Sequence, residues 1–293
     1  MIYVFLTGKQ EQDRYLKQVA IGIGGKLVYT RQFLSIIEKR PGMPRKVKAK
    51  KLYDATGLVF AGILRGNYHI LKSALTNNIP FYYIDHAYFN AGYGKPHWMR
   101  ITKNGFCQNQ ILPNANSDRF NSNFSLEFND YNFKEKKNIL VLPPSNSTAR
   151  VFGDTNWETI ITKKIKQHTD RPIVVRRKNG PIMDDMMLLQ KDKEKYIYDE
   201  TLDQALNKAY CVVTYNSAVA LTALQRGIPV ICEKFCPAYP LSHDISEIEN
   251  LIEKDRLPLF SSLAHGQYKM KEAADPRTYK FINSSIQWKG SLK

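Results

Sequence analysis

The sequence lacks any long uninterrupted apolar stretch. Its apolar runs are broken within about eight residues, well short of the roughly 18 to 20 that a membrane-spanning helix needs. The N-terminus, MIYVFLTGKQEQDRYLK, has neither the basic leader nor the small-residue cleavage site of a secretory signal. These absences predict a soluble or peripheral protein without stable membrane insertion.

Cysteine is scarce and has no metal-binding spacing. The four cysteines are Cys107, Cys211, Cys232 and Cys236, and none of them forms a CxxC pair. Cys211 and Cys232 lie inside apolar, strand-like runs, where a free thiol packs as a small hydrophobic group. We therefore expect no metal site and a reducing, cytoplasmic environment.

Acidic residues are too few to balance the basic ones. The chain has 43 Lys and Arg against 27 Asp and Glu, which gives a formal net charge of +16. The densest basic segment, Lys39 to Lys51, contains no acid, and its prolines and glycine predict a loop. It is either a solvated loop or a clamp on a phosphate backbone, and the concentration of charge favours the clamp. The cations that we expect to contact nucleic acid there are Arg40, Arg45, Lys46, Lys48, Lys50 and Lys51.

The chain does contain a repeated alternation of strand and helix patterns. Apolar runs at 2–6, 58–63, 80–84, 138–142, 172–175, 211–214 and 228–231 alternate with helical patterns of about ten residues. Short apolar strands separated by helices indicate parallel sheets, whose ligands bind at the carboxyl ends of the strands. We predict an α/β protein with two Rossmann-like domains facing across a cleft. The expected domains are 1–130 and 131–265, joined through an Asn-rich stretch and followed by a C-terminal segment, 266–293.

One predicted strand ends in Asn216 and Ser217, where a helix is expected to begin. The free N–H groups of a helix start, with the Asn amide and the Ser hydroxyl, can bind a phosphate. Asn and Ser are also ordinary helix caps. Both a cap and a phosphate site therefore fit these residues.

The string from Val212 to Ile231, in which Ser217 opens a helix that ends before Gly227-Ile-Pro-Val, resembles the donor-binding region of GT-B glycosyltransferases. The similarity is greatest to capsule-polysaccharide-type enzymes and to phage DNA-base glycosyltransferases. It covers about residues 138 to 234 and only loosely the first half. The resemblance implies a metal-independent enzyme that requires no cofactor, uses a nucleotide-sugar such as a UDP-sugar as co-substrate, and returns residues 266–293 to the first domain.

The resemblance also implies donor contacts at the ends of the second domain's strands. An arginine there would hold phosphate oxygens in pairs, and a carboxylate would face the ribose hydroxyls. For the arginines, a solvated strand end is the alternative. The implied donor-binding residues are Ser145, Arg176, Arg177, Tyr215, Asn216, Ser217 and Glu233.

In the first half, Asp85 and His86 end a predicted strand. An acceptor hydroxyl must lose its proton as it attacks the sugar, and a carboxylate or imidazole in a partly desolvated cleft can take it. Asp85 is the first candidate for this base and His86 the second, although both also fit satisfied polar groups at a strand end. Arg100 lies in a stretch that resembles a basic segment of these families, which implies a contact with phosphate or acceptor, and a surface strand is the alternative.

The charge favours DNA as the acceptor. Our leading hypothesis is sugar transfer to a hydroxymethylated pyrimidine of duplex DNA, such as hydroxymethylcytosine, by a bacteriophage enzyme in the host cytoplasm. The target base would have to leave the stack to reach the donor. A glycosyltransferase for a polysaccharide or lipid-linked acceptor and a non-catalytic nucleic-acid-binding protein are the alternatives. No feature of the sequence specifies an oligomeric state.

Overall fold

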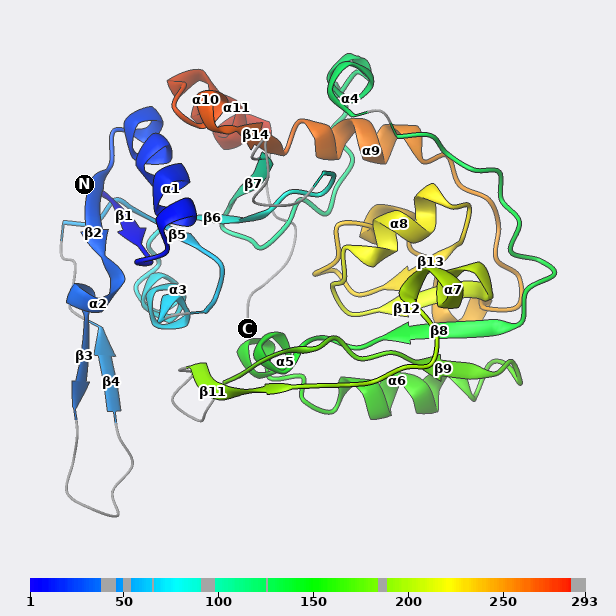
Figure 1. Cartoon of the computed structure of the whole chain (residues 1–293). Helices are drawn as coiled ribbons and strands as arrows, with labels where there is room; N and C mark the ends of the chain where they lie inside the picture. The colour runs from blue at the N-terminus through cyan, green and yellow to red at the C-terminus, as the bar shows by residue number, and fades with distance from the viewer. Residues whose placement is uncertain are drawn as a thin grey trace. The chain divides into compact units, whose positions relative to one another are not determined.

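The computed structural model describes residues 1–37, 46–49, 54–64, 66–90, 98–124, 126–183 and 189–285 (Figure 1). The chain divides into two compact units. Unit 1 comprises Met1–Gln108, Met183–Lys191 and Gly266–Lys293, and unit 2 comprises Asn109–Ile182 and Asp192–His265. Each unit contains its own sheet with parallel strands and covering helices, so the α/β prediction is confirmed.

The sheet of unit 1 has six strands in the order β14-β7-β6-β5-β1-β2. The four strands at one side, β6, β5, β1 and β2, are parallel, whereas β7 runs antiparallel to β6 and β14 antiparallel to β7. Strand β5 is buried along its whole length, as expected for a strand covered on both faces. The strands are β1 (Ile2–Leu6), β2 (Lys26–Tyr29), β5 (Gly57–Ala61), β6 (Phe81–His86), β7 (Trp98–Lys103) and β14 (Gln267–Lys269).

Helix α1 (Gln10–Ile23) packs against two helices from the far end of the chain, α10 (Met270–Ala273) and α11 (Pro276–Ser285). A side chain at Gly22 of α1 would collide with the Ala273 carbonyl and the Tyr279 ring, so this close approach requires glycine. The Tyr15 hydroxyl donates to the Tyr268 carbonyl at 3.0 Å. Residues 266–285 therefore complete unit 1. The other helices of unit 1 are α2 (Thr30–Phe33) and α3 (Asn67–Thr76).

Part of the basic segment predicted as a loop is a strand. Strand β3 (Leu34–Ile37) pairs antiparallel with β4 (Lys46–Ala49), and the register places Lys46 opposite Ile37 and Lys48 opposite Ser35. Alternating Lys, Val, Lys and Ala fit the two-residue period of a strand, which the surrounding prolines and charges obscured.

The sheet of unit 2 has four parallel strands in the order β13-β12-β8-β9. They are β8 (Asn138–Leu142), β9 (Ile173–Val175), β12 (Ala209–Thr214) and β13 (Val230–Cys232). Their helices are α5 (Asn146–Phe152), α6 (Trp157–Ile165), α7 (Leu202–Asn207) and α8 (Val219–Gln225). Two further short strands, β10 (Gly180–Met183) and β11 (Leu189–Glu194), pair with each other.

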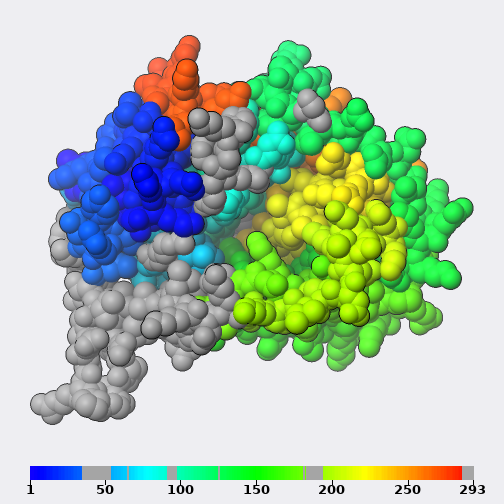
Figure 2. Space-filling view, viewed as in Figure 1, coloured from blue at the N-terminus to red at the C-terminus, as the bar shows by residue number. Residues whose placement is uncertain are grey.

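The chain passes from unit 1 to unit 2 after residue 108, earlier than the boundary expected at 130. Residues 109–130 belong to unit 2 because their aromatic side chains pack there. Phe120, on α4 (Asp118–Asn123), and Phe128 each contact Phe260 of α9 (Leu257–Ala264), with ring centroids 5.9 and 4.9 Å apart. Figures 1 and 2 show this segment in green within unit 2, and its Asn129 N–H donates to the carbonyl of Gln225, the last residue of α8.

Gly227 ends α8 in the left-handed region, with φ of 70°. A side chain there would collide with the backbone of Asp130 and Tyr131. The glycine therefore both terminates the helix and lets the segment around Asp130 pass against it. None of the helices formed by the described residues is long and apolar enough to span a bilayer.

Candidate functional site

A pocket of about 630 Å³ opens in unit 2 at the carboxyl ends of three parallel strands. The chain leaves the central strand β8 toward β9 on one side and later returns to β12 on the other side. Adjacent strands whose connections leave in opposite directions create a crevice at their carboxyl ends, the usual ligand position in such sheets. The pocket is lined by Leu142, Pro143, Arg176, Arg177, Lys178, Asn179, Tyr196, Tyr198, Asp199, Glu200, Thr201, Leu202, Ser217 and Val219.

Arg176 follows β9 directly and lines the pocket, as its position in the sequence predicts. Its backbone N–H continues the β9 pairing by donating to the Val141 carbonyl at 2.9 Å. Its guanidinium lies 4.3 Å from the centre of the Tyr198 ring and donates to the Glu200 carbonyl at 2.8 Å. Arg176 thus holds the opposite pocket wall through one N–H and keeps its other donors for a ligand.

Arg177 also lines the pocket but is committed to a partner on α6. Its guanidinium forms a two-pronged pair with the Glu158 carboxylate, with Nε 2.7 Å from Oε2. The hydrogen bonds that Arg177 donates to the Glu158 carboxylate raise the pKa of Arg177. Its backbone N–H donates to the Tyr198 hydroxyl at 2.6 Å. Arg177 therefore stabilises the pocket wall, and its contacts with Glu158 leave its guanidinium less available to a phosphate.

Lys178 is the cation of this pocket that remains open. Its side chain is exposed, and among the described residues it has no hydrogen-bond or ion-pair partner. Beside it, Asn179 accepts from the Tyr196 backbone N–H at 2.5 Å, and Tyr196 and Tyr198 both line the pocket. Sequence reasoning stopped at Arg177 and missed Lys178 and both tyrosines. The continuous Arg-Arg-Lys run could have indicated Lys178, but no pattern indicated the tyrosines.

Ser217 lines the pocket, but the helix that it was expected to open begins at Val219. The Ser217 N–H donates to the Thr214 hydroxyl at 3.3 Å, and the Ser217 hydroxyl accepts from the Val219 N–H at 3.2 Å. The N–H groups of Ser217 and Val219 are therefore engaged within the turn between β12 and α8 and are not free for a phosphate. Ser217 can offer a ligand its hydroxyl, while Asn216 is half-buried beside it and outside the lining residues.

Three other expected donor contacts are not among the lining residues. Tyr215 is 1% exposed in the core of unit 2, and its hydroxyl donates to Asp154. Burial, together with that contact, raises the pKa of Tyr215. Glu233 follows β13 and accepts from the Trp157 indole N–H at 3.0 Å. Ser145 caps α5 by accepting from the Thr148 N–H at 3.3 Å.

In unit 1, Asp85 and Arg100 lie directly opposite each other on β6 and β7 and form an ion pair of 3.0 Å. Asp85 also accepts from the Tyr83 hydroxyl and from the His86 backbone N–H, both at 2.8 Å. Arg100 lies over the Tyr88 ring, and its buried Nε has no hydrogen-bond partner within the described parts of the chain. Asp85, the candidate base, and Arg100, the candidate phosphate contact, thus form an ion pair with each other.

The environment of Asp85 decides its protonation. Burial opposes ionisation, but the Arg100 guanidinium, the His86 N–H and the Tyr83 hydroxyl outweigh it and lower the pKa of Asp85. The Asp85 charge in turn helps to raise the pKa of Arg100, against the effect of burial. An ionised carboxylate can stabilise positive charge or attack a carbon, but three donors make it a weaker proton acceptor. His86 is exposed at the end of the same strand.

The loop after β1 in unit 1 is occupied by the protein's own carboxylate. Asp13, 8% exposed, accepts from the Thr7 N–H at 2.7 Å, the Gly8 N–H at 2.9 Å and the Thr7 hydroxyl at 3.0 Å. A phosphate would need the same donors. The loop of unit 1 that corresponds in position to the loop after β8 is therefore closed to an anion.

Most of the basic segment lies outside the described residues. Arg40, Arg45, Lys50 and Lys51 lie outside the described residues, and Lys46 and Lys48 are placed only by their backbone in β4. Within the described ranges, no group of three or more His, Cys, Asp or Glu side chains could hold a metal ion.

Comparisons with known proteins find similar solved structures but no sequence match. The chain is similar to the solved structure of Thermosulfurimonas dismutans KpsC, a beta Kdo 2,7 transferase, with a TM-score of 0.48 and 14% sequence identity. The match covers 95% of this chain and 99% of that chain. No family model and no curated protein matches the sequence. The function is therefore inferred from the geometry of the site itself.

Proposed function

We propose that the protein is a glycosyltransferase whose nucleotide-sugar donor binds in the pocket of unit 2. The observation that carries this proposal is the pocket at the carboxyl ends of β8, β9 and β12, with cations on one wall and tyrosines beside them. Its volume of about 630 Å³ is within the range of small-molecule sites.

The lining residues match the parts of a nucleotide-sugar. Lys178 and the remaining donors of Arg176 can bind the phosphates by charge-assisted hydrogen bonds. Tyr196 and Tyr198 offer aromatic surface to a base. The Asn179 amide, the Ser217 hydroxyl and the carboxylates of Asp199 and Glu200 can bind sugar hydroxyls. A site with fewer polar groups would favour an apolar ligand instead.

In unit 1, we propose that Asp85 and His86 act on the acceptor half of the reaction. Asp85 stays ionised beside Arg100, and the exposed His86 follows it at the strand end. The proposal assigns proton removal from the acceptor hydroxyl to His86 and electrostatic support to Asp85, which reverses the order expected from the sequence. In this assignment Arg100 holds Asp85 in place.

The net charge of +16 supports a polyanionic acceptor. We propose a hydroxymethylated pyrimidine of duplex DNA, with a UDP-sugar as donor and without a metal requirement. An acidic glycan or lipid-linked acceptor is the alternative that the same charge supports.

The first test is donor binding. Calorimetric titration with UDP, UDP-glucose and other nucleotide-sugars should give saturable binding, which Lys178→Ala weakens. Lys163→Ala, on an exposed position of α6 in the same unit, is the matched control and should bind as the unmodified protein does. No binding of any nucleotide or nucleotide-sugar would contradict the proposal.

The second test identifies the acceptor. Incubation with donor and duplex DNA containing plain or 5-hydroxymethylated cytosine, followed by mass spectrometry of the nucleosides, should show a sugar-sized mass gain on the modified base only. The gain should be lost in His86→Ala and Asp85→Asn and kept in Glu11→Gln. Donor hydrolysis or binding without DNA modification would favour the glycan acceptor.

A further inference from the structure

The excess positive charge lies almost entirely in unit 1. Of the 43 Lys and Arg, 24 belong to unit 1 and 19 to unit 2, whereas of the 27 Asp and Glu, 9 belong to unit 1 and 18 to unit 2. The formal charge is thus +15 for unit 1 and +1 for unit 2. The pocket thus belongs to the nearly neutral unit 2, and the positive charge that would attract a polyanion belongs to unit 1.

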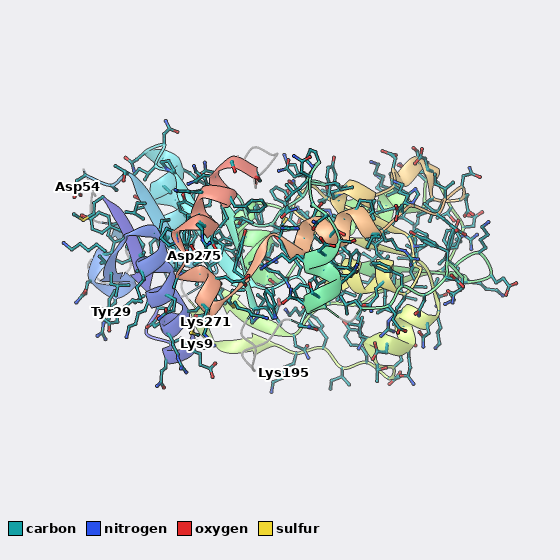
Figure 3. The ribbon with its side chains drawn as sticks, turned by 90° about the horizontal axis from the view of Figure 1, so that it is seen from above. Lys9, Tyr29, Asp54, Lys195, Lys271 and Asp275 are labelled. Carbon is teal, nitrogen blue, oxygen red and sulfur yellow. The ribbon has the colours of Figure 1, made fainter. Side chains whose placement is uncertain are left out.

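Part of this charge forms a surface on three packed helices, α1, α10 and α11. Figure 3 looks down on these helices and labels Lys9 and Lys271. Four cations on them are exposed and have no ion-pair partner among the described residues: Arg14, Lys17, Lys271 and Lys280. Like charges held together repel each other, and a bound polyanion relieves that repulsion.

The acids near these cations are already engaged or few. Asp275 pairs with Arg277 at 2.6 Å, and Glu272 accepts from the Lys269 backbone N–H at 2.6 Å. Glu11 is the exposed acid of α1. Unit 2 differs because several of its cations have carboxylate partners, as in the pairs Arg171–Glu249, Lys208–Glu200 and Arg226–Asp203.

We propose that the surface of α1, α10 and α11 binds the phosphate backbone of a duplex nucleic acid. Arg14 and Lys17 are three residues apart and share the outer face of α1, so both can contact one backbone. Of the aromatic side chains on the described parts of these helices, Tyr15 and Tyr279 are buried and Phe281 is half-buried, so none is a fully exposed ring of the kind on which single-stranded bases stack.

A membrane is a poorer fit for this surface. A helix that lies in a membrane interface needs a free apolar face. The apolar face of α1, with Leu16 and Val19 fully buried, belongs to the core of unit 1. On the outer side Ile21 is the large apolar residue that is exposed, at 64%. The surface therefore offers charge without an apolar face to insert.

The surface can be tested without any nucleotide-sugar, so failure of this proposal would leave the donor proposal intact. Fluorescence anisotropy with a labelled DNA duplex, at about 50 to 200 mM salt, gives both the affinity and its salt dependence. The double variant Arg14→Glu/Lys17→Glu should weaken binding at least about tenfold and reduce the slope of log K against log salt by about 2. Lys271→Glu/Lys280→Glu should act in the same direction.

The matched control is Lys163→Glu/Lys164→Glu, which reverses two exposed lysines on α6 of unit 2. It should change the affinity much less than the unit 1 variants, and urea unfolding should show that all variants remain folded. Equal losses from the unit 1 and unit 2 variants would overturn the proposal. So would tight binding to phosphatidylserine vesicles with no binding to duplex DNA.

Discussion

The two units build similar parallel sheets but treat the ends of their strands differently. In unit 1 the loop after β1 is filled by Asp13, and the end of β6 carries the Asp85–Arg100 pair. In unit 2 the loop after β8 begins with Pro143 and Pro144, which have no N–H to offer, and a pocket lies beside it. A sheet of this kind thus provides a position for a ligand, and the local side chains decide whether the protein fills that position itself.

The difference also predicts how each unit would bind a phosphate. Unit 1 has its backbone donors after β1 satisfied by a carboxylate, so a ligand would have to displace Asp13. Unit 2 has lost the backbone donors of Pro143 and Pro144, so its pocket depends on side chains, Lys178 above all. The following changes test this contrast, beginning with the largest expected effect.

Arg100→Ala should destabilise unit 1 most, by about 3 kcal/mol, because it leaves the Asp85 carboxylate without its cation in a partly buried position. The free energy of unfolding from urea titration measures the loss. Asp85→Asn, which removes the charge and keeps the shape, should cost less. An Arg100→Ala variant as stable as the unmodified protein would show that the pair does not hold the strand end.

The effect of Arg100 should depend on pH. The folded-state pKa of Asp85 is lowered below the unfolded value of about 3.9, so the pair stabilises the fold above that pH. The stabilisation is lost as the pH falls through the folded-state pKa. The difference in unfolding free energy between the unmodified protein and Arg100→Ala should therefore be constant near neutral pH and shrink below about pH 4.

Asp13→Ala should cost about 2 kcal/mol, because the Thr7 and Gly8 N–H groups and the Thr7 hydroxyl lose the charged acceptor that the buried Asp13 provides. Glu11→Ala, an exposed change in the same turn of α1, is the control and should be close to neutral. If the vacated loop were the better phosphate site, Asp13→Ala would partly recover its stability in millimolar phosphate. Full stability in the absence of phosphate would contradict the role given to Asp13.

Lys178→Ala should weaken nucleotide binding about tenfold, or about 1.4 kcal/mol, through the loss of one charge-assisted hydrogen bond. Its stability should not change, since the side chain is exposed and has no partner among the described residues. Calorimetry against Lys163→Ala measures the first effect and urea titration the second. A loss of stability with unchanged affinity would show that Lys178 stabilises the pocket wall and does not bind the nucleotide.

Ser145→Ala should have the smallest effect, a loss of about 1 kcal/mol of stability from the missing cap of α5. Nucleotide affinity should stay the same, because Ser145 is not among the residues that line the pocket. A drop in affinity as large as that of Lys178→Ala would instead support the donor contact expected from the sequence.

Much of the fold could be predicted from apolar runs. Ile2 to Leu6 and Asn138 to Leu142 are strands as expected, because continuous apolar runs between helices become the inner strands of parallel sheets. Strand β14 could not be predicted, since Gln-Tyr-Lys has no apolar pattern and pairs with β7 far away in the sequence. The sequence assigns residues 109–130 to the first domain and its linker, because the many Asn and Ser residues there hide the pattern of the phenylalanines that pack on Phe260.

The sequence predicts which residues follow the carboxyl ends of the strands. It does not predict which of their side chains point into the pocket and which point into the core. Arg176 and Ser217 follow strands β9 and β12, and both line the pocket. Tyr215 lies two residues before Ser217 in the same turn after β12, but its ring packs in the core of unit 2. Two positions thus separate the core residue Tyr215 from the pocket residue Ser217, and composition gives no sign of which is which.

The return of residues 266–285 to unit 1 has a consequence for the order of synthesis. Unit 2 is complete once residue 265 has been made, but until then the sheet of unit 1 lacks β14, and α1 lacks the helices that cover Gly22. During synthesis, unit 2 can therefore fold while unit 1 still lacks β14, α10 and α11. Unit 1 can complete its fold only after residues 266–285 have been made.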